Sequence, residues 1–114
     1  MEEKEINITK VYFKNFIEKL RPEDPETRKE IDFGYSWDGK IAYLNETHPQ
    51  WDNPSNILHY PFAKIRYYKS REEWNLYWFR ANGKWESYEP FPIADTLQEL
   101  LEVIAADEWN CFFG

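Results

Sequence analysis

The chain has 114 residues, of which 42% are hydrophobic and 19% aromatic, and its formal net charge is −7. This composition excludes a disordered chain, and the length predicts one domain over residues 1–114. The negative charge argues against a general nucleic-acid binder, because such proteins need a cationic surplus to displace counterions from phosphates.

The cysteine count and the hydropathy pattern exclude further classes of protein. Cys111 is the only cysteine, which excludes an internal disulfide framework and a thiolate-cluster zinc site. Residues 1–10 are charged and lack an apolar segment, and no run reaches the roughly 18 apolar residues of a membrane span. We therefore expect a cytoplasmic protein without a membrane segment, and the sequence indicates no cofactor.

The first predicted element is a helix over about residues 6–20, because apolar side chains recur there at helical spacing. Asn7 or Thr9 is a suitable residue to cap its start. The polar segment 22–30 that follows is expected to be a loop with room for one helical turn.

A β-hairpin follows. Alternation of apolar and polar residues predicts a strand at about 31–37, and Asp38-Gly39 favours a two-residue turn into a second strand at about 40–46. That turn would place Phe33 opposite Leu44, and by the same count Tyr35 opposite Ala42.

Residues 47–56 contain two prolines and are expected to form a loop. Alternating patterns then predict strands at about 60–69, 74–81 and 84–88. Asn82-Gly83 favours a two-residue turn between the last two strands.

The last element is a helix over about residues 97–106, opened by a capping box in which Thr96 and Glu99 satisfy each other's free amides. The tail, residues 109–114, is apolar and is expected to pack against the domain. The order of elements predicts an α+β fold, in which a five-stranded antiparallel meander is flanked by an N-terminal and a C-terminal helix on one face.

The side-chain period of two divides the later strands into two faces. A two-residue turn at Asn82-Gly83 would pair Phe79 with Glu86 and Tyr77 with Tyr88, and a loop at 70–73 would pair Ile65 with Trp78. One face is then apolar and forms the core. The other alternates flat rings with cations: Lys64, Arg66, Tyr68, Tyr77, Phe79 and Tyr88.

Two interpretations of this ring-and-cation face stay open. Cross-strand aromatic and cation–π pairs stabilise a solvated sheet by about 0.2–1 kcal/mol each, which needs no ligand. The same arrangement could also bind a flat or anionic partner, as single-strand nucleic-acid binders do by stacking bases on sheet aromatics. Burial of the face in a homodimer is a further possibility.

Other residues offer weaker functional signals. Trp51 is either a lid over the open edge of the core or an exposed contact for a protein partner. His48, His59 and Asp52 could form an open metal site, although no diagnostic ligand spacing is present. Cys111 next to apolar residues favours a small buried hydrophobe over a nucleophile.

From Arg21-Pro22 to the C-terminus the chain resembles the domain-of-unknown-function 3024 family of small bacterial proteins. The resemblance implies a compact, standalone bacterial domain and transfers no catalytic or binding residues. The chain differs from the pattern expected of this family at His48, where an arginine is expected, and at the Asn82-Gly83 turn. The matching residues are Ile31 to Tyr35, Pro49-x-Trp51, Pro61-x-Ala63-Lys64, Tyr67, Trp74-x-Leu76-Tyr77-Trp78, Arg80-Ala81, Lys84-Trp85, Tyr88-x-Pro90 and the terminal Cys-Phe-Phe-Gly.

The sequence therefore predicts a non-enzymatic binding module that recognises a protein partner through the ring-and-cation face, with Trp51 as a second contact. Single-stranded nucleic-acid binding on the same face is the first alternative, opposed by the net charge. A small metal-dependent hydrolase that uses His48, His59 and Asp52 is the second.

Overall fold

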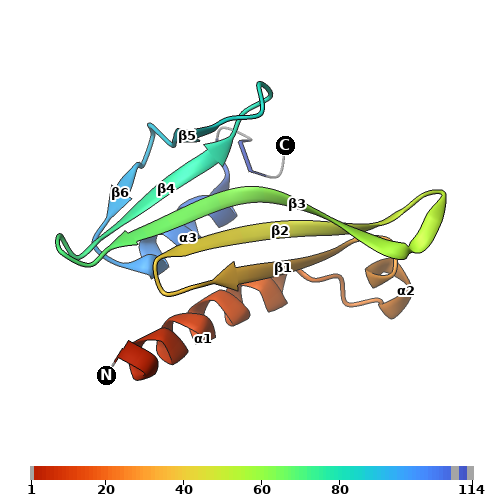
Figure 1. Ribbon diagram of the computed structural model, residues 1–114, viewed down its shortest axis with the longest axis horizontal. Coiled ribbons are helices and arrows are strands. Elements are labelled where there is room, and N and C mark those ends of the chain that lie inside the picture. The colour runs from red at the N-terminus through yellow and green to blue at the C-terminus, as the bar shows by residue number, and fades with distance from the viewer. Residues whose placement is uncertain (1, 109–110, 113–114) are drawn as a thin grey trace.

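The computed structural model of the chain describes residues 2–108 and 111–112. Its elements are α1 (Glu2–Leu20), α2 (Pro25–Arg28), β1 (Asp32–Trp37), β2 (Ile41–Gln50), β3 (Asn53–Tyr68), β4 (Glu73–Phe79), β5 (Trp85–Ser87), β6 (Ile93–Ala94) and α3 (Leu97–Ala106). Strands β1 to β5 lie side by side in chain order, and the short β6 pairs with β4 (Figure 1). This arrangement confirms the predicted α+β class with an antiparallel meander between two terminal helices.

Helix α1 begins at Glu2, earlier than predicted, so that Asn7 and Thr9 lie inside the helix and do not cap it. The residues at positions 2–5 are glutamate and lysine, which are good helix formers. The predicted apolar stripe is confirmed, because Phe13 and Ile17 are buried. None of the helices in the described part of the chain is both long and apolar enough to cross a membrane.

The first hairpin has a longer turn than predicted. Tyr35 lies opposite Leu44, where the sequence predicted Phe33. The carboxylate of Asp38 accepts the backbone amides of residues 40 and 41 at 2.8 and 2.7 Å, which closes a wider loop than a two-residue turn. Because the register differs from the predicted one by two residues, every side chain keeps its predicted face.

Strands β2 and β3 form the longest hairpin, which extends beyond the other strands at the right of Figure 1. Residues 47–56 were expected to be a loop, and that prediction was wrong: β2 runs on to Gln50, and only Trp51 and Asp52 form the turn. Pro49 lies beyond Thr47, the last β2 residue paired with β1, and a missing amide costs little on such a free edge. We call residues 48–58 the hairpin arm.

Strands β3 and β4 pair with Ile65 opposite Leu76 instead of Trp78. The difference is again two residues, so the predicted faces are correct. Ile65 and Leu76 are fully buried, and Trp78 packs against the same core.

The turn between β4 and β5 is where the predicted register was wrong by one residue. Phe79 lies opposite Trp85, not Glu86. The amide of Gly83 donates to the carbonyl of Arg80 at 2.9 Å, and Gly83 has a φ of 81°. A type I turn followed by a left-handed glycine is a three-residue loop. An odd difference exchanges the faces of β5, so that Tyr88 lies in the core and Trp85 on the opposite face.

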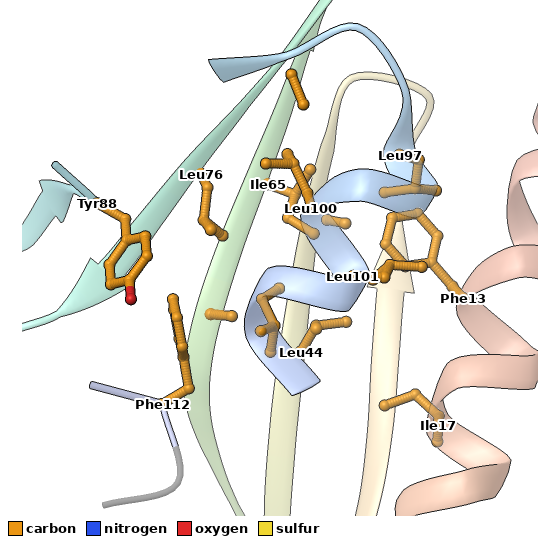
Figure 2. Packing of buried hydrophobic residues seen from close by; sticks show 14 residues of the cluster. Phe13, Ile17, Leu44, Ile65, Leu76, Tyr88, Leu97, Leu100, Leu101 and Phe112 are labelled. Atoms are coloured by element: carbon orange, nitrogen blue, oxygen red, sulfur yellow. The ribbon is translucent and has the colours of Figure 1, made fainter. Parts of the chain in front are cut away.

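The core lies between the sheet and the helices, as Figure 2 shows for Leu100 and Leu101 of α3. The predicted N-cap of α3 is confirmed, because Thr96 Oγ1 accepts the amide of Glu99 at 3.3 Å. The carboxylate of Glu99 accepts the hydroxyl group of Thr96 at 3.1 Å, whereas a complete capping box would pair it with the backbone amide of Thr96. In the predicted tail, Phe112 is buried. Residues 109–110 and 113–114 lie outside the described residues.

Candidate recognition surface

The sheet has one face that neither long helix covers. Both α1 and α3 contribute to one core cluster, and in Figure 1 the strands lie in front of α3. On the opposite face, Tyr43, Lys64 and Tyr77 lie side by side across β2, β3 and β4. We call this surface the open face. It consists of Tyr43, Lys64, Arg66, Tyr68, Tyr77, Phe79 and Trp85.

Aromatic rings form a continuous apolar area on the open face. The ring centroid of Trp85 lies 4.9 Å from that of Phe79 and 5.8 Å from that of Tyr43. The contact between Trp85 and Tyr43 joins strands that are not neighbours in the sheet. Phe79 is nevertheless 41% exposed, so part of this apolar area remains in contact with water.

Cations lie over the tyrosines of the same face. The Nζ atom of Lys64 is 5.2 Å from the ring centroid of Tyr77. The guanidinium groups of Arg66 and Arg71 are 4.5 and 4.2 Å from the ring centroid of Tyr68. Such contacts at exposed sites contribute about 0.5–1 kcal/mol each, which is enough to orient the cations without neutralising them.

These cations differ in their carboxylate partners. Arg71 forms an ion pair with Glu73 at 3.2 Å. Within the part of the chain that the structure describes, neither Lys64 nor Arg66 forms a salt bridge. The open face therefore presents positive charge on a chain whose net charge is −7.

The hydroxyl groups of two tyrosines meet on this face. Burial raises the pKa of Tyr77, and its hydrogen bond with Tyr68 raises it further, against the opposing effects of Arg66 and Arg71. Tyr77 therefore remains neutral at physiological pH and offers a hydroxyl group to a polar partner.

The structure brings together most of the residues predicted for this surface: Lys64, Arg66, Tyr68, Tyr77 and Phe79. Tyr88 was assigned wrongly. It is 2% exposed, and its ring lies 4.9 Å from that of Phe112 in the core (Figure 2). Tyr43 and Trp85 also lie on this face but were not predicted to do so. A three-residue loop ending at Gly83 would have placed Trp85 opposite Phe79.

Trp51 lies at the tip of the hairpin arm and is 91% exposed. The interpretation as a lid over the core was therefore wrong. Its role as a contact for a protein partner stays a prediction.

The residues considered for a metal site are not brought together. His59 lies opposite Thr47, so His48 projects from the other face of the ribbon. His48 Nε2 is 2.9 Å from a carboxylate oxygen of Glu46, and Asp52 lies in the turn at the tip. Among the described residues, no three acidic, histidine or cysteine side chains form a group that could hold a metal ion.

Cys111 packs against the core beside Tyr88 and Phe112. Burial raises the pKa of its thiol, and the negative charge of Asp107 raises it further. A higher pKa disfavours the thiolate, which is the nucleophilic form.

Comparison with known proteins identifies a family. The model of one family, described as domain of unknown function (DUF3024), matches residues 1–114. The chain belongs to this family. The match confirms the resemblance seen in the sequence and extends it through α1 of this DUF3024 protein. No curated protein and no solved structure matches the chain.

Proposed function

We propose that this DUF3024 protein is a non-enzymatic binding module whose open face recognises an acidic segment of a protein partner. One observation carries the proposal: Lys64 and Arg66 lie over the half-buried rings of two tyrosines, and neither cation has a carboxylate partner in the described part of the chain. A carboxylate of a bound partner would form the ion pair that these two cations do not form within the described part of the chain.

The chemistry of the face fits such a partner. Protein interfaces are enriched in aromatic residues and arginine, and a few central rings dominate their energetics. In this proposal Phe79 and Trp85 provide apolar contact area, while Arg66 orients a carboxylate through its planar guanidinium.

The overall charge of −7 does not prevent this contact. At physiological ionic strength, charges separated by more than about 8 Å of solvent are largely screened. An acidic segment seated on the open face would therefore respond mainly to Lys64, Arg66 and Arg71 and much less to carboxylates elsewhere on the molecule.

Affinity capture with charge-reversed variants tests the proposal. The wild type, the double variant Lys64→Glu/Arg66→Glu and the control Lys14→Glu/Lys19→Glu are used as baits in a lysate of the native organism, with and without nuclease. Both variants change the net charge equally, but the control residues are exposed on α1. We expect a nuclease-resistant protein to be retained by the wild type and the control and lost by the open-face variant.

Two results would contradict the proposal. If the folded open-face variant retains the same proteins as the wild type, the cations serve only to stabilise the sheet. If both charge-reversed variants lose the partner equally, the effect is one of net charge and does not involve the open face.

Single-stranded nucleic acid is the second candidate, favoured by the same contacts between cations and tyrosine rings. It predicts that nuclease removes the captured material. It also predicts that the logarithm of the binding constant for an oligonucleotide falls steeply and linearly with the logarithm of salt concentration.

A further inference from the structure

The residues of the open face are arranged along β3. Lys64, Arg66 and Tyr68 occupy alternate positions of this strand, so they follow one another on the same face at intervals of about 6.7 Å. On β4, Tyr77 lies opposite Lys64 and Glu73 lies opposite Tyr68. The part of the open face from Lys64 to Tyr68 therefore extends about 13 Å in the direction of β3.

Two tyrosine side chains lie along this part of the sheet. Tyr77 is four positions of β3 away from Tyr68, because it lies opposite Lys64. The two tyrosines are nevertheless joined by a hydrogen bond between their side chains. Across a distance of about 13 Å they meet only if each side chain extends along the sheet toward the other. The open face is therefore a flat strip that runs parallel to β3.

One end of the strip is apolar. Phe79 lies two residues beyond Tyr77 on β4, in the direction away from Tyr68, and is paired with Trp85. The ring centroid of Trp85 is also 5.8 Å from that of Tyr43. Because Phe79 is 41% exposed, an apolar side chain of a partner would gain contact area at this end.

Two cations follow the apolar end in succession. Lys64 comes first, with its Nζ atom 5.2 Å from the ring centroid of Tyr77, and Arg66 occupies the next position on the same face. Neither forms a salt bridge within the part of the chain that the structure describes. Glu73, a carboxylate of the same strip, is paired with Arg71 at 3.2 Å. The order along the strip is thus apolar surface, first cation, second cation.

We propose that the open face binds an extended segment that lies along β3 and carries an apolar residue followed by acidic residues at every second position. The inference rests on the proposed function and adds the conformation and sequence pattern of the acidic partner. In an extended chain every second side chain points to the same side, at the interval that separates Lys64 from Arg66. An apolar residue over Phe79 and Trp85 would then place successive carboxylates over the two cations.

Two synthetic peptides of equal composition and charge test this pattern. The first is Leu-Ser-Glu-Ser-Glu-Ser-Glu and the second is Leu-Ser-Ser-Ser-Glu-Glu-Glu, both with blocked ends. Each is also made in the reverse direction, because a strip of side chains does not fix the direction of the bound chain. When extended, the first presents three carboxylates on the side of its leucine and the second presents two. We expect the first pattern to bind about threefold more tightly, the ratio that one exposed ion pair provides.

Indole N–H signals in ¹H–¹⁵N NMR spectra of the full chain locate the bound peptide. Trp85 lies at the apolar end of the strip, and Trp51 lies at the tip of the hairpin arm. Single Trp→Phe variants assign the two signals. We expect the first peptide to shift the signal of Trp85 and to leave that of Trp51 unchanged.

Charge variants show whether the two cations cause the preference, and their NMR spectra show that they are folded. In Lys64→Gln/Arg66→Gln we expect both patterns to bind weakly and with equal affinity. The control Lys14→Gln/Lys19→Gln removes the same charge from exposed positions of α1 and should keep the preference of the wild type.

Three results would overturn this inference: equal affinities of the wild type for the two patterns; a preference that persists in Lys64→Gln/Arg66→Gln; or no shift of the Trp85 signal by any of the peptides up to about 5 mM, which corresponds to a negligible affinity. If both patterns shift the signal equally and the open-face variant loses both shifts, the pattern is rejected and recognition of acidic segments is retained. The proposed function itself is tested by capture of a native protein, which does not depend on these peptides.

Discussion

The register of β4 and β5 predicts unequal losses of stability when two aromatic residues are truncated. Tyr88 is 2% exposed and contacts Phe112, whereas Phe79 is 41% exposed and contacts Trp85. Replacing a buried large aromatic residue by alanine costs about 3–5 kcal/mol, and we expect Tyr88→Ala to lower the free energy of unfolding by that amount. Burying a whole Phe side chain contributes about 1.5–3 kcal/mol, of which about three-fifths applies to Phe79, so Phe79→Ala should cost about 1–2 kcal/mol.

Urea unfolding, followed by circular dichroism, measures both losses. A small domain has a total stability of about 5–15 kcal/mol, so Tyr88→Ala is expected to lose a large part of it. Tyr88→Phe keeps the ring and should remain within about 1.5 kcal/mol of the wild type, which provides a folded reference. Equal losses for the two alanine variants, or a greater loss for Phe79→Ala, would show that Tyr88 lies on the open face and that the turn has two residues.

Four further predictions concern local structure. Thr96→Ala removes the N-cap of α3 and should lower the free energy of unfolding by about 1 kcal/mol, whereas Gln98→Ala, on an exposed position of the same helix, should leave it nearly unchanged. Gly83 has a φ of 81° with no atom within 4 Å of an added Cβ, so Gly83→Ala should cost about 1–2 kcal/mol from backbone strain alone, as measured by urea unfolding. Gly34→Ala has the same free space without a positive φ, and should leave the stability unchanged or raise it by about 0.4–1 kcal/mol. Hydrogen bonds from two backbone amides lower the pKa of Asp38; its contribution to stability should therefore be present above the ordinary pKa of 3.8 and be lost as the pH falls through the lowered value, which an NMR titration and unfolding of Asp38→Asn can measure.

The arrangement of strands could be predicted from the sequence because side-chain periodicity specifies which face is buried. The first hairpin and the β3–β4 hairpin each differ from the predicted register by two residues, and a shift of two keeps every side chain on its face. The assignments of Ile65 to the core and of Lys64 to the opposite face therefore survived errors in the turns.

The β4–β5 turn could not be predicted from its dipeptide alone. Asn82-Gly83 is compatible with a two-residue loop and with a three-residue loop that ends in a left-handed glycine. The structure contains the second, with the amide of Arg80 donating to the carbonyl of Lys84 at 2.9 Å. A difference of one residue placed Tyr88 in the wrong environment and concealed Trp85.

The hairpin arm was missed because proline was interpreted as the end of a strand. Pro49 and Pro54 lie where β2 and β3 have each other as their only neighbours, and Pro61 lies at an irregularity in the register opposite residues 44 and 45. Prolines are tolerated at such edges and bulges. Trp51 is exposed because the arm holds it at its tip. The prediction of a loop at 47–56 therefore gave no reason to expect this exposure.

Site-specific photocrosslinking tests most directly whether the open face is the recognition surface. A photoreactive phenylalanine analogue is placed at Phe79 on the open face, at Trp51 on the arm tip, and at Lys14 on the exposed side of α1 as a control. We expect a protein crosslink from position 79 that disappears in the Lys64→Glu/Arg66→Glu background and is absent from position 14. A crosslink from position 51 alone, or equal crosslinks from positions 79 and 14, would contradict recognition through the open face.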